Sequence, residues 1–315
     1  MVETVARERG RLFERPAQPR ALRITDRDLQ LLQNLARLRL ASVVQLAALD
    51  GGSEQNVSRA LLALWENQFV ERVIGQIESR LLSKGSYPTV YGLTRQGAWL
   101  LRKNGFEVRR RLLYEIDKQR DAGWRFIEHR VEITAFMVRL QLAARLRTDV
   151  GVLDRGIILQ DAPKTRRDRR ARLAAKVRID GALKQHSVDP DEIFGLRFLE
   201  TEEESYFLLE CDRGEMPVHR RKSKDQTYYA KKMLIYYEAN RTGEHIRELG
   251  IPNFRMATVT TTAKRVEQMI DAQQEITNGH GSNMFLFIDE ASLAASNPLD
   301  ALWITGKGDR IRLPD

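Results

Sequence analysis

Acidic side chains gather near the end of one predicted strand. The alternating pattern of residues 205–212 predicts a strand that carries Glu210 and Asp212 on the same face. Asp191 stands at the start of the preceding predicted strand, where it could approach the same spot. Carboxylates that converge on one point can hold Mg²⁺, which activates a water molecule for phosphodiester hydrolysis.

A lysine is available to complement these acids. A long helix is expected over residues 221–238, with Lys231 and Lys232 in its middle. A lysine beside the carboxylates would stabilise the charge of the transition state. The opposing interpretation is a site without catalysis, whose acids are solvated and whose domain serves binding or dimerisation.

These residues belong to a predicted second domain, residues 124–290. It begins with a strongly amphipathic helix at residues 124–147. Further strands are expected at residues 152–160, 177–183, 192–199, 254–260 and 284–288, and a further helix at residues 263–276. This order implies a mixed sheet flanked by helices. An arginine-rich stretch, residues 164–176, is either a solvated loop or a second phosphate-binding patch.

The first third of the chain predicts a separate, mostly helical domain at residues 23–105. Helices are expected after Thr25, at residues 42–49 and after Ser53, followed by a hairpin with strands at residues 70–74 and 89–93 and a closing helix after Thr94. The third helix carries side chains that can bond base edges or phosphates: Gln55, Asn56, Ser58 and Arg59. The hairpin tip adds Arg80, Lys84 and Tyr87.

Composition bounds the classes of partner. The 315 residues include 52 Lys and Arg against 43 Asp and Glu, an excess that suits a polyanion such as nucleic acid. Cys211 is the only cysteine, which excludes an intrachain disulfide. No apolar run reaches the length of a membrane span, and residues 1–22 form a basic arm without the apolar core of a signal peptide. We expect a cytoplasmic protein without a membrane partner, a linker at residues 106–123 and a tail at residues 291–315.

The predicted first domain, residues 23–105, resembles the winged helix-turn-helix family. The order helix, helix, helix, hairpin, helix is typical of that family, and residues 91–101 match the pattern Y-x-L-T-x-x-G-x-x-L-L of its exit from the wing. The resemblance implies that the third helix enters the major groove while the wing touches the backbone. The alternative is a winged helix that serves protein contacts.

The second domain resembles the PD-(D/E)xK, or restriction-endonuclease-like, fold. Pro190-Asp191, the segment 207–214 and Lys232-x-x-x-Tyr236 are more closely similar to the replication-relaxation family, which joins a winged helix to such a domain. That family overlaps the MobC-type relaxases, which start conjugative transfer without the usual tyrosine chemistry. The resemblance implies that Asp191 and Glu210 are the two acids. Asp212 occupies the position of the usual lysine, which would then come from Lys231 or Lys232.

Together these observations predict an α+β protein with an N-terminal winged helix-turn-helix followed by a nuclease-like mixed sheet. Its partner would be double-stranded DNA, in the replication, relaxation or mobilisation of a plasmid or other mobile element. A nickase would use Asp191, Glu210, Asp212 and Lys232, with Mg²⁺ held by the three acids. The alternative is a sequence-specific transcriptional regulator whose inactive second domain forms a homodimer or docks a partner. A pure protein-interaction adaptor is a third class.

Overall fold

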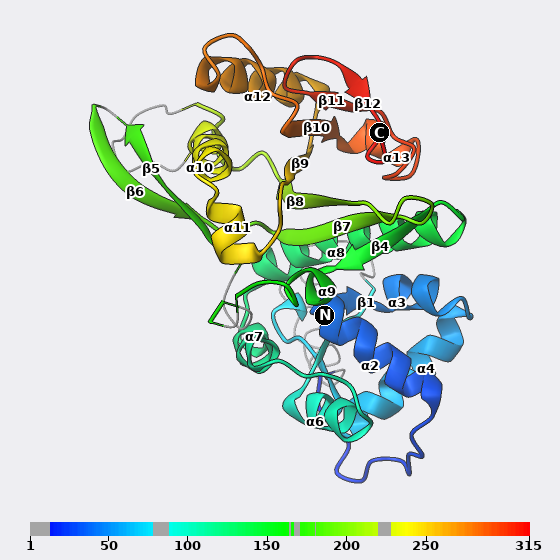
Figure 1. Cartoon of the computed structure of the whole chain (residues 1–315). Helices are drawn as coiled ribbons and strands as arrows, with labels where there is room; N and C mark the ends of the chain where they lie inside the picture. Colours follow the sequence, from blue (N-terminus) through cyan, green and yellow to red (C-terminus); the bar gives the residue numbers. More distant parts are fainter. Residues whose placement is uncertain (1–12, 78–87, 164, 167–170, 180, 220–227) are drawn as a thin grey trace, which may run out of the picture. The chain divides into compact units, whose positions relative to one another are not determined.

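The computed structural model describes residues 13–77, 88–163, 165–166, 171–179, 181–219 and 228–315 (Figure 1). The chain divides into two compact units, Met1–Val138 and Arg139–Asp315. Helix α8, Trp124–Arg145, runs across this division. None of the helices in the described ranges has the length and apolar character that a bilayer crossing requires.

The first unit is built from short helices and a small sheet. Its elements are α2 Asp26–Leu38, β1 Leu40–Ser42, α3 Val43–Asp50, α4 Glu54–Glu66, β2 Val70–Arg72, β3 Val90–Leu93 and α6 Arg95–Lys103, followed by α7 Arg110–Arg120. The strands pair antiparallel in the order β1-β3-β2. The predicted order of helices and hairpin is confirmed. Strand β1 was not predicted, because three residues are too few to show an alternating pattern.

Polar residues start the helices of this unit as their sequence predicts. Thr25 and Asp28 form a capping box at α2, and the Ser53 side chain accepts from the backbone of Asn56 at the start of α4. Along α4, Val57 and Leu61 are fully buried, so this face of the helix belongs to the core.

Segments at both ends of the first unit pack onto it. Before α2, the Arg15 Nε atom donates to the backbone oxygen of Trp65 at 2.7 Å, and Arg20 pairs with the buried carboxylate of Glu66. In α7, Glu115 and Ile116 are buried. Residues that the sequence assigned to an arm and to a linker therefore contribute to the packing of this unit.

The second unit contains a seven-stranded mixed sheet. Its elements are β4 Val150–Asp154, α9 Arg155–Ile158, β5 Leu173–Ile179, β6 Ala182–Val188, β7 Glu192–Phe198, β8 Glu204–Asp212, α10 Tyr229–Arg241, α11 Glu244–Leu249, β9 Arg255–Thr260, α12 Ala263–Ile276, β10 Phe285–Asp289, α13 Glu290–Ala294, β11 Trp303–Thr305 and β12 Arg310–Ile311. The sheet order is β12-β11-β10-β9-β8-β7-β4, with parallel pairing of β8 with β9 and of β9 with β10. This arrangement confirms the mixed α+β class.

Helices α10 and α12 pack against each other, and α12 contacts strands β9 and β10 of this sheet (Figure 1). Met233 and Tyr236 of α10 join Leu208 of β8, Met256 of β9 and Phe287 of β10 in one buried cluster. Because alternate residues of a strand share a face, Leu208 places Glu210 and Asp212 on the same helix-covered side.

Some predicted elements are wrong in detail. Residues 177–183 are not one strand but a hairpin, because Gly181 with φ +76 turns the chain between β5 and β6. The strand expected at residues 152–160 ends at Asp154, whose side chain caps α9. Helix α10 begins at Tyr229, since Tyr228 has extended backbone angles, and residues 220–227 lie outside the described part. The sheet also continues beyond residue 290, through β11 and β12.

Candidate functional site

Glu210 is a carboxylate buried on the helix-covered face of the sheet. Only 1% of its surface is exposed. Lys232 Nζ donates to Glu210 Oε2, and the Tyr236 hydroxyl donates to Glu210 Oε1 at 2.6 Å. Both oxygens of this carboxylate therefore have donors, as a buried charged group requires.

The donors come from one face of α10. Tyr229, Lys232 and Tyr236 stand three and four residues apart, the spacing that aligns side chains along a helix. The Tyr229 hydroxyl bonds Thr258 Oγ1 at 2.9 Å, and Thr258 is the partner of Glu210 in the register of β8 with β9. Helix α10 is thus hydrogen-bonded to β8 through Glu210 and to β9 through Thr258.

Burial shifts the titration of these groups. It raises the pKa of Glu210 to about 7, an effect that the Lys232 charge opposes and the Asp191 charge reinforces. Burial lowers the pKa of Lys232, but the charges of Glu210 and Asp191 outweigh it and the net direction is upward. Burial and the charge of Glu210 raise the pKa of Tyr236 well above the ordinary tyrosine value. Lys232 is therefore the cation of this cluster at neutral pH.

Asp191 lies beside Glu210 at the start of β7. Its backbone N–H donates to the Leu209 oxygen at 3.0 Å, and its Oδ2 accepts from the Cys211 N–H at 2.9 Å. Since Glu192 pairs with Leu209, Asp191 continues the register to a position opposite Glu210. The two acids that the sequence predicts on adjacent strands are thus brought together.

Asp212 has a different set of partners. Its Oδ1 accepts from Arg265 Nη2 at 2.8 Å, and its Oδ2 accepts from Thr260 Oγ1 at 2.6 Å and from Arg265 Nε. Only 5% of the Asp212 side chain is exposed. Asp212 therefore belongs to a buried ion pair with α12, whereas Lys232 pairs with Glu210.

The predicted metal ligands do not form a ready group of three. Among the described residues, no three Asp, Glu, His or Cys side chains gather in a way that could hold a metal ion. Asp191 and Glu210 still offer the hard oxygen atoms that Mg²⁺ prefers, and a carboxylate oxygen that accepts one hydrogen bond keeps a second lone pair. The metal site at Asp191, Glu210 and Asp212 stays a prediction.

The predicted DNA-contacting residues of α4 lie on its surface. Gln55, Asn56, Ser58 and Arg59 are all exposed, while Val57 between them is buried. Their role in DNA binding stays a prediction. Arg80, Lys84 and Tyr87 lie outside the described residues.

Sequence reasoning missed the partner of Asp212. Arg265 stands on the helix after β9, and nothing in its local sequence distinguishes it from the other arginines of the chain. Its proximity follows from the pairing of Asp212 with Thr260, which brings the end of β8 to the start of α12. The role of Tyr236 could have been found from its four-residue spacing to Lys232.

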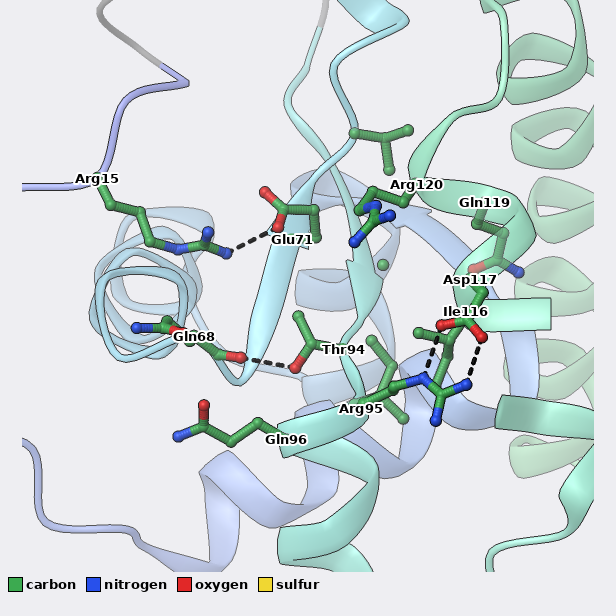
Figure 2. A pocket seen from close by; sticks show the side chains of 13 residues that line it. Arg15, Gln68, Glu71, Thr94, Arg95, Gln96, Ile116, Asp117, Gln119 and Arg120 are labelled. Atoms are coloured by element: carbon green, nitrogen blue, oxygen red, sulfur yellow. Dashed lines mark hydrogen bonds and ion pairs between the residues drawn. The ribbon is translucent and has the colours of Figure 1, made fainter. Parts of the chain in front are cut away.

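A cleft of about 250 Å³ opens in the first unit. Figure 2 shows that its charged side chains point toward one another: Arg15 donates to Glu71 at 2.8 Å and Arg95 Nε donates to Asp117 at 2.7 Å. Thr94 closes one side through a bond to the Gln68 oxygen. The side chains that line the cleft thus connect the segment before α2 to strand β2 and helix α7 to helix α6.

Comparisons with known proteins identify the family of this chain. Neither a search of curated proteins nor a search of solved structures gave a match. The replication-relaxation family matches residues 32–246, well over half of the chain. The match includes helix α4 and the cluster of Asp191, Glu210 and Lys232. The chain therefore belongs to the replication-relaxation family.

Proposed function

We propose that this protein binds duplex DNA through its first unit and nicks one strand at the Glu210 site of its second unit. It would do so in the replication, relaxation or mobilisation of a plasmid or other mobile element. The observation that carries this proposal is the bond from Lys232 to Glu210 beside Asp191. A nuclease of the PD-(D/E)xK type requires two acids and a lysine, and here the lysine comes from α10. Membership of the replication-relaxation family supports a role in replication or relaxation.

The residues of the site have separable tasks. Lys232 supplies a positive charge, held in place by Glu210, that would stabilise a phosphate in the transition state. Tyr236 orients the Glu210 carboxylate through its hydroxyl. Asp191 and Glu210 would hold Mg²⁺, and the bound ion would activate water and neutralise charge on the phosphate. Arg265 keeps Asp212 neutralised, so Asp212 would contribute to the packing of β8 against α12.

The first unit would bring the site to DNA. Helix α4 presents Gln55, Asn56, Ser58 and Arg59 to solvent, all of which can bond base edges or phosphates. The sheet order β1-β3-β2 beside α4 suits a winged helix-turn-helix, in which such a helix lies in the major groove. Exposure of these four polar residues on one helix is the support for DNA binding.

One observation favours a second candidate, a transcriptional regulator with an inactive second unit. Asp212 stands at the position where a PD-(D/E)xK nuclease usually has its lysine, and Arg265 donates to both oxygens of the Asp212 carboxylate. Both oxygens of Glu210 also have donors from α10. A site built only for stability would have the same contacts.

Plasmid nicking separates the two candidates. Supercoiled plasmid that carries the protein's selected binding site is incubated with wild type or with Glu210→Gln, in Mg²⁺ or Mn²⁺. The proposal expects nicked circles with wild type and a loss of orders of magnitude in rate with the variant, at unchanged DNA affinity. Wild type that binds its site tightly but nicks it with neither metal would contradict the nickase and support the regulator.

A further inference from the structure

The hairpin β5–β6 is a separate structural feature of the second unit. Its strands, Leu173–Ile179 and Ala182–Val188, pair only with each other among the described strands. A two-stranded hairpin is marginally stable alone, and this one packs on α10, the helix that carries Lys232 (Figure 1). Leu173, Val177 and Val188 are buried.

The solvent-facing side of the hairpin is basic. Lys176 and Arg178 alternate with the buried residues of β5, and both are exposed. On β6, Lys184 stands opposite the buried Val177, so it belongs to the other face of the hairpin, and its side chain is exposed as well. None of these three side chains has an ion-pair partner among the residues that the structure describes. The described residues of the two strands include no acid.

Positive charge continues from the hairpin onto α10. His186 of β6 is half-buried, and burial together with the charges of Lys231 and Lys184 lowers its pKa. Lys231 directly precedes Lys232 on α10. The charge of Lys231 acts on His186 of the hairpin, whereas Lys232 donates to Glu210. A run of positive charge therefore leads along the hairpin to the Glu210 site.

We propose that the β5–β6 hairpin binds the phosphate backbone of duplex DNA and holds the duplex at the Glu210 site. A two-stranded ribbon fits the major groove, and exposed lysine and arginine side chains bind phosphates without regard to sequence. This inference rests on the proposed function, because it assigns where the second unit contacts its DNA. The competing explanation is protection of free strand edges, for which proteins also use charged residues. Protection works with charges of either sign, whereas the charged residues of the two strands β5 and β6 are all lysine or arginine.

The test is the salt dependence of binding to a short fluorescent duplex of arbitrary sequence. The full chain is compared with the triple variant Lys176→Gln, Arg178→Gln, Lys184→Gln. Each phosphate contact contributes about 0.9 to the slope of log affinity against log salt, so the triple variant should lose about 2 to 3 from that slope. A matched control, Lys307→Gln, Arg310→Gln, Lys264→Gln, removes the same charge from exposed positions elsewhere in the unit and should leave the slope unchanged.

The outcomes separate this inference from the proposed function. An unchanged slope in the triple variant, or an equal loss in the control, would overturn the hairpin as a DNA contact. Aggregation of the triple variant at an unchanged slope would assign its charges to edge protection. The single variants Lys176→Gln and Lys184→Gln, each expected to lose about 1 from the slope, replace the triple variant if it does not stay folded. Wild type that binds no duplex at all would overturn both proposals. Weaker binding by Arg59→Ala together with a wild-type slope in the triple variant would overturn only the hairpin.

Discussion

Lys232 and Glu210 form a buried ion pair across 22 residues of sequence, from helix α10 to strand β8. The carboxylate is almost fully enclosed, with 2% of its side chain exposed, whereas the lysine retains 21%. The pair therefore has one enclosed member and one that reaches toward solvent. Such an arrangement suits a lysine that must meet a phosphate while its position is held by a buried acid.

Replacing Lys232 should make stability depend on pH. Burial raises the pKa of Glu210 to about 7 from 4.5, and the Lys232 charge opposes this rise. In Lys232→Met the pKa of Glu210 rises further, so folded Glu210 keeps a proton that the unfolded chain releases. The stability of the variant is then retained at low pH. It is lost as the pH rises from the pKa of Glu210 in the unfolded chain through its higher pKa in the folded protein. We expect a larger loss of unfolding free energy at about pH 8 than at about pH 5, approaching 3–5 kcal/mol at the higher pH.

Urea titrations in the presence of a chelator measure this effect. Lys264→Met removes an exposed lysine from α12 and should change stability little at either pH. Equal destabilisation of Lys232→Met at both pH values would mean that Glu210 is not the titrating group.

Removing Arg265 should destabilise the second unit. Arg265→Ala leaves Asp212 with its remaining bond to Thr260 in a site where 5% of the side chain is exposed. Loss of one member of a buried pair costs about 3–5 kcal/mol. Chemical denaturation should detect this, with Arg310→Ala as an exposed control. A loss no larger than that of the control would show that Asp212 does not depend on Arg265.

Tyr236→Phe tests how the Glu210 carboxylate is oriented. The substitution removes the hydroxyl that donates to Glu210 at 2.6 Å and keeps the ring that packs in the core. A hydrogen bond to a charged group contributes about 1.5–3 kcal/mol, and we expect a stability loss in that range. We also expect slower nicking at unchanged DNA affinity. Tyr237→Phe, on the neighbouring position of α10, is the control, and an equal effect of both variants would contradict the role of Tyr236.

Arg59→Ala should weaken specific DNA binding without loss of stability. Arg59 is exposed on α4, and a side chain that reads a guanine contributes about 1–3 kcal/mol. Competition binding between a selected duplex and an arbitrary one measures the specific part. Arg102→Ala on α6 is the exposed control. Identical specificity of Arg59→Ala and wild type would argue against α4 as the reading helix.

The fold was predictable where local pattern and tertiary packing agree. Helix α12 occupies residues 263–276 as its periodicity predicts, and strands β7 and β8 follow their apolar runs on either side of an acidic turn. The hairpin at Gly181 was missed, because the apolar residues on both sides of the turn suggested one continuous strand. Strand β1 was missed because it is defined by pairing with β3 rather than by its own sequence.

The candidate site shows the same limit. Alternation along β8 placed Glu210 and Asp212 on one face, and the register with β9 agrees with that placement. The partners of these two acids come from different helices, Lys232 from α10 and Arg265 from α12. Local sequence cannot choose between such long-range partners, since every lysine and arginine of the chain is a candidate.

The most direct test of the proposed nickase site is the nicking rate of Lys232→Met under single-turnover conditions, at a temperature where the variant is folded. If Lys232 stabilises the transition state from α10, the rate should fall by about 10²–10³ relative to wild type while the affinity for duplex DNA is retained. Lys264→Met, measured in parallel, should nick at the wild-type rate. Nicking by Lys232→Met at the rate of wild type would contradict the assignment of this lysine and of the Glu210 site as the place of cleavage.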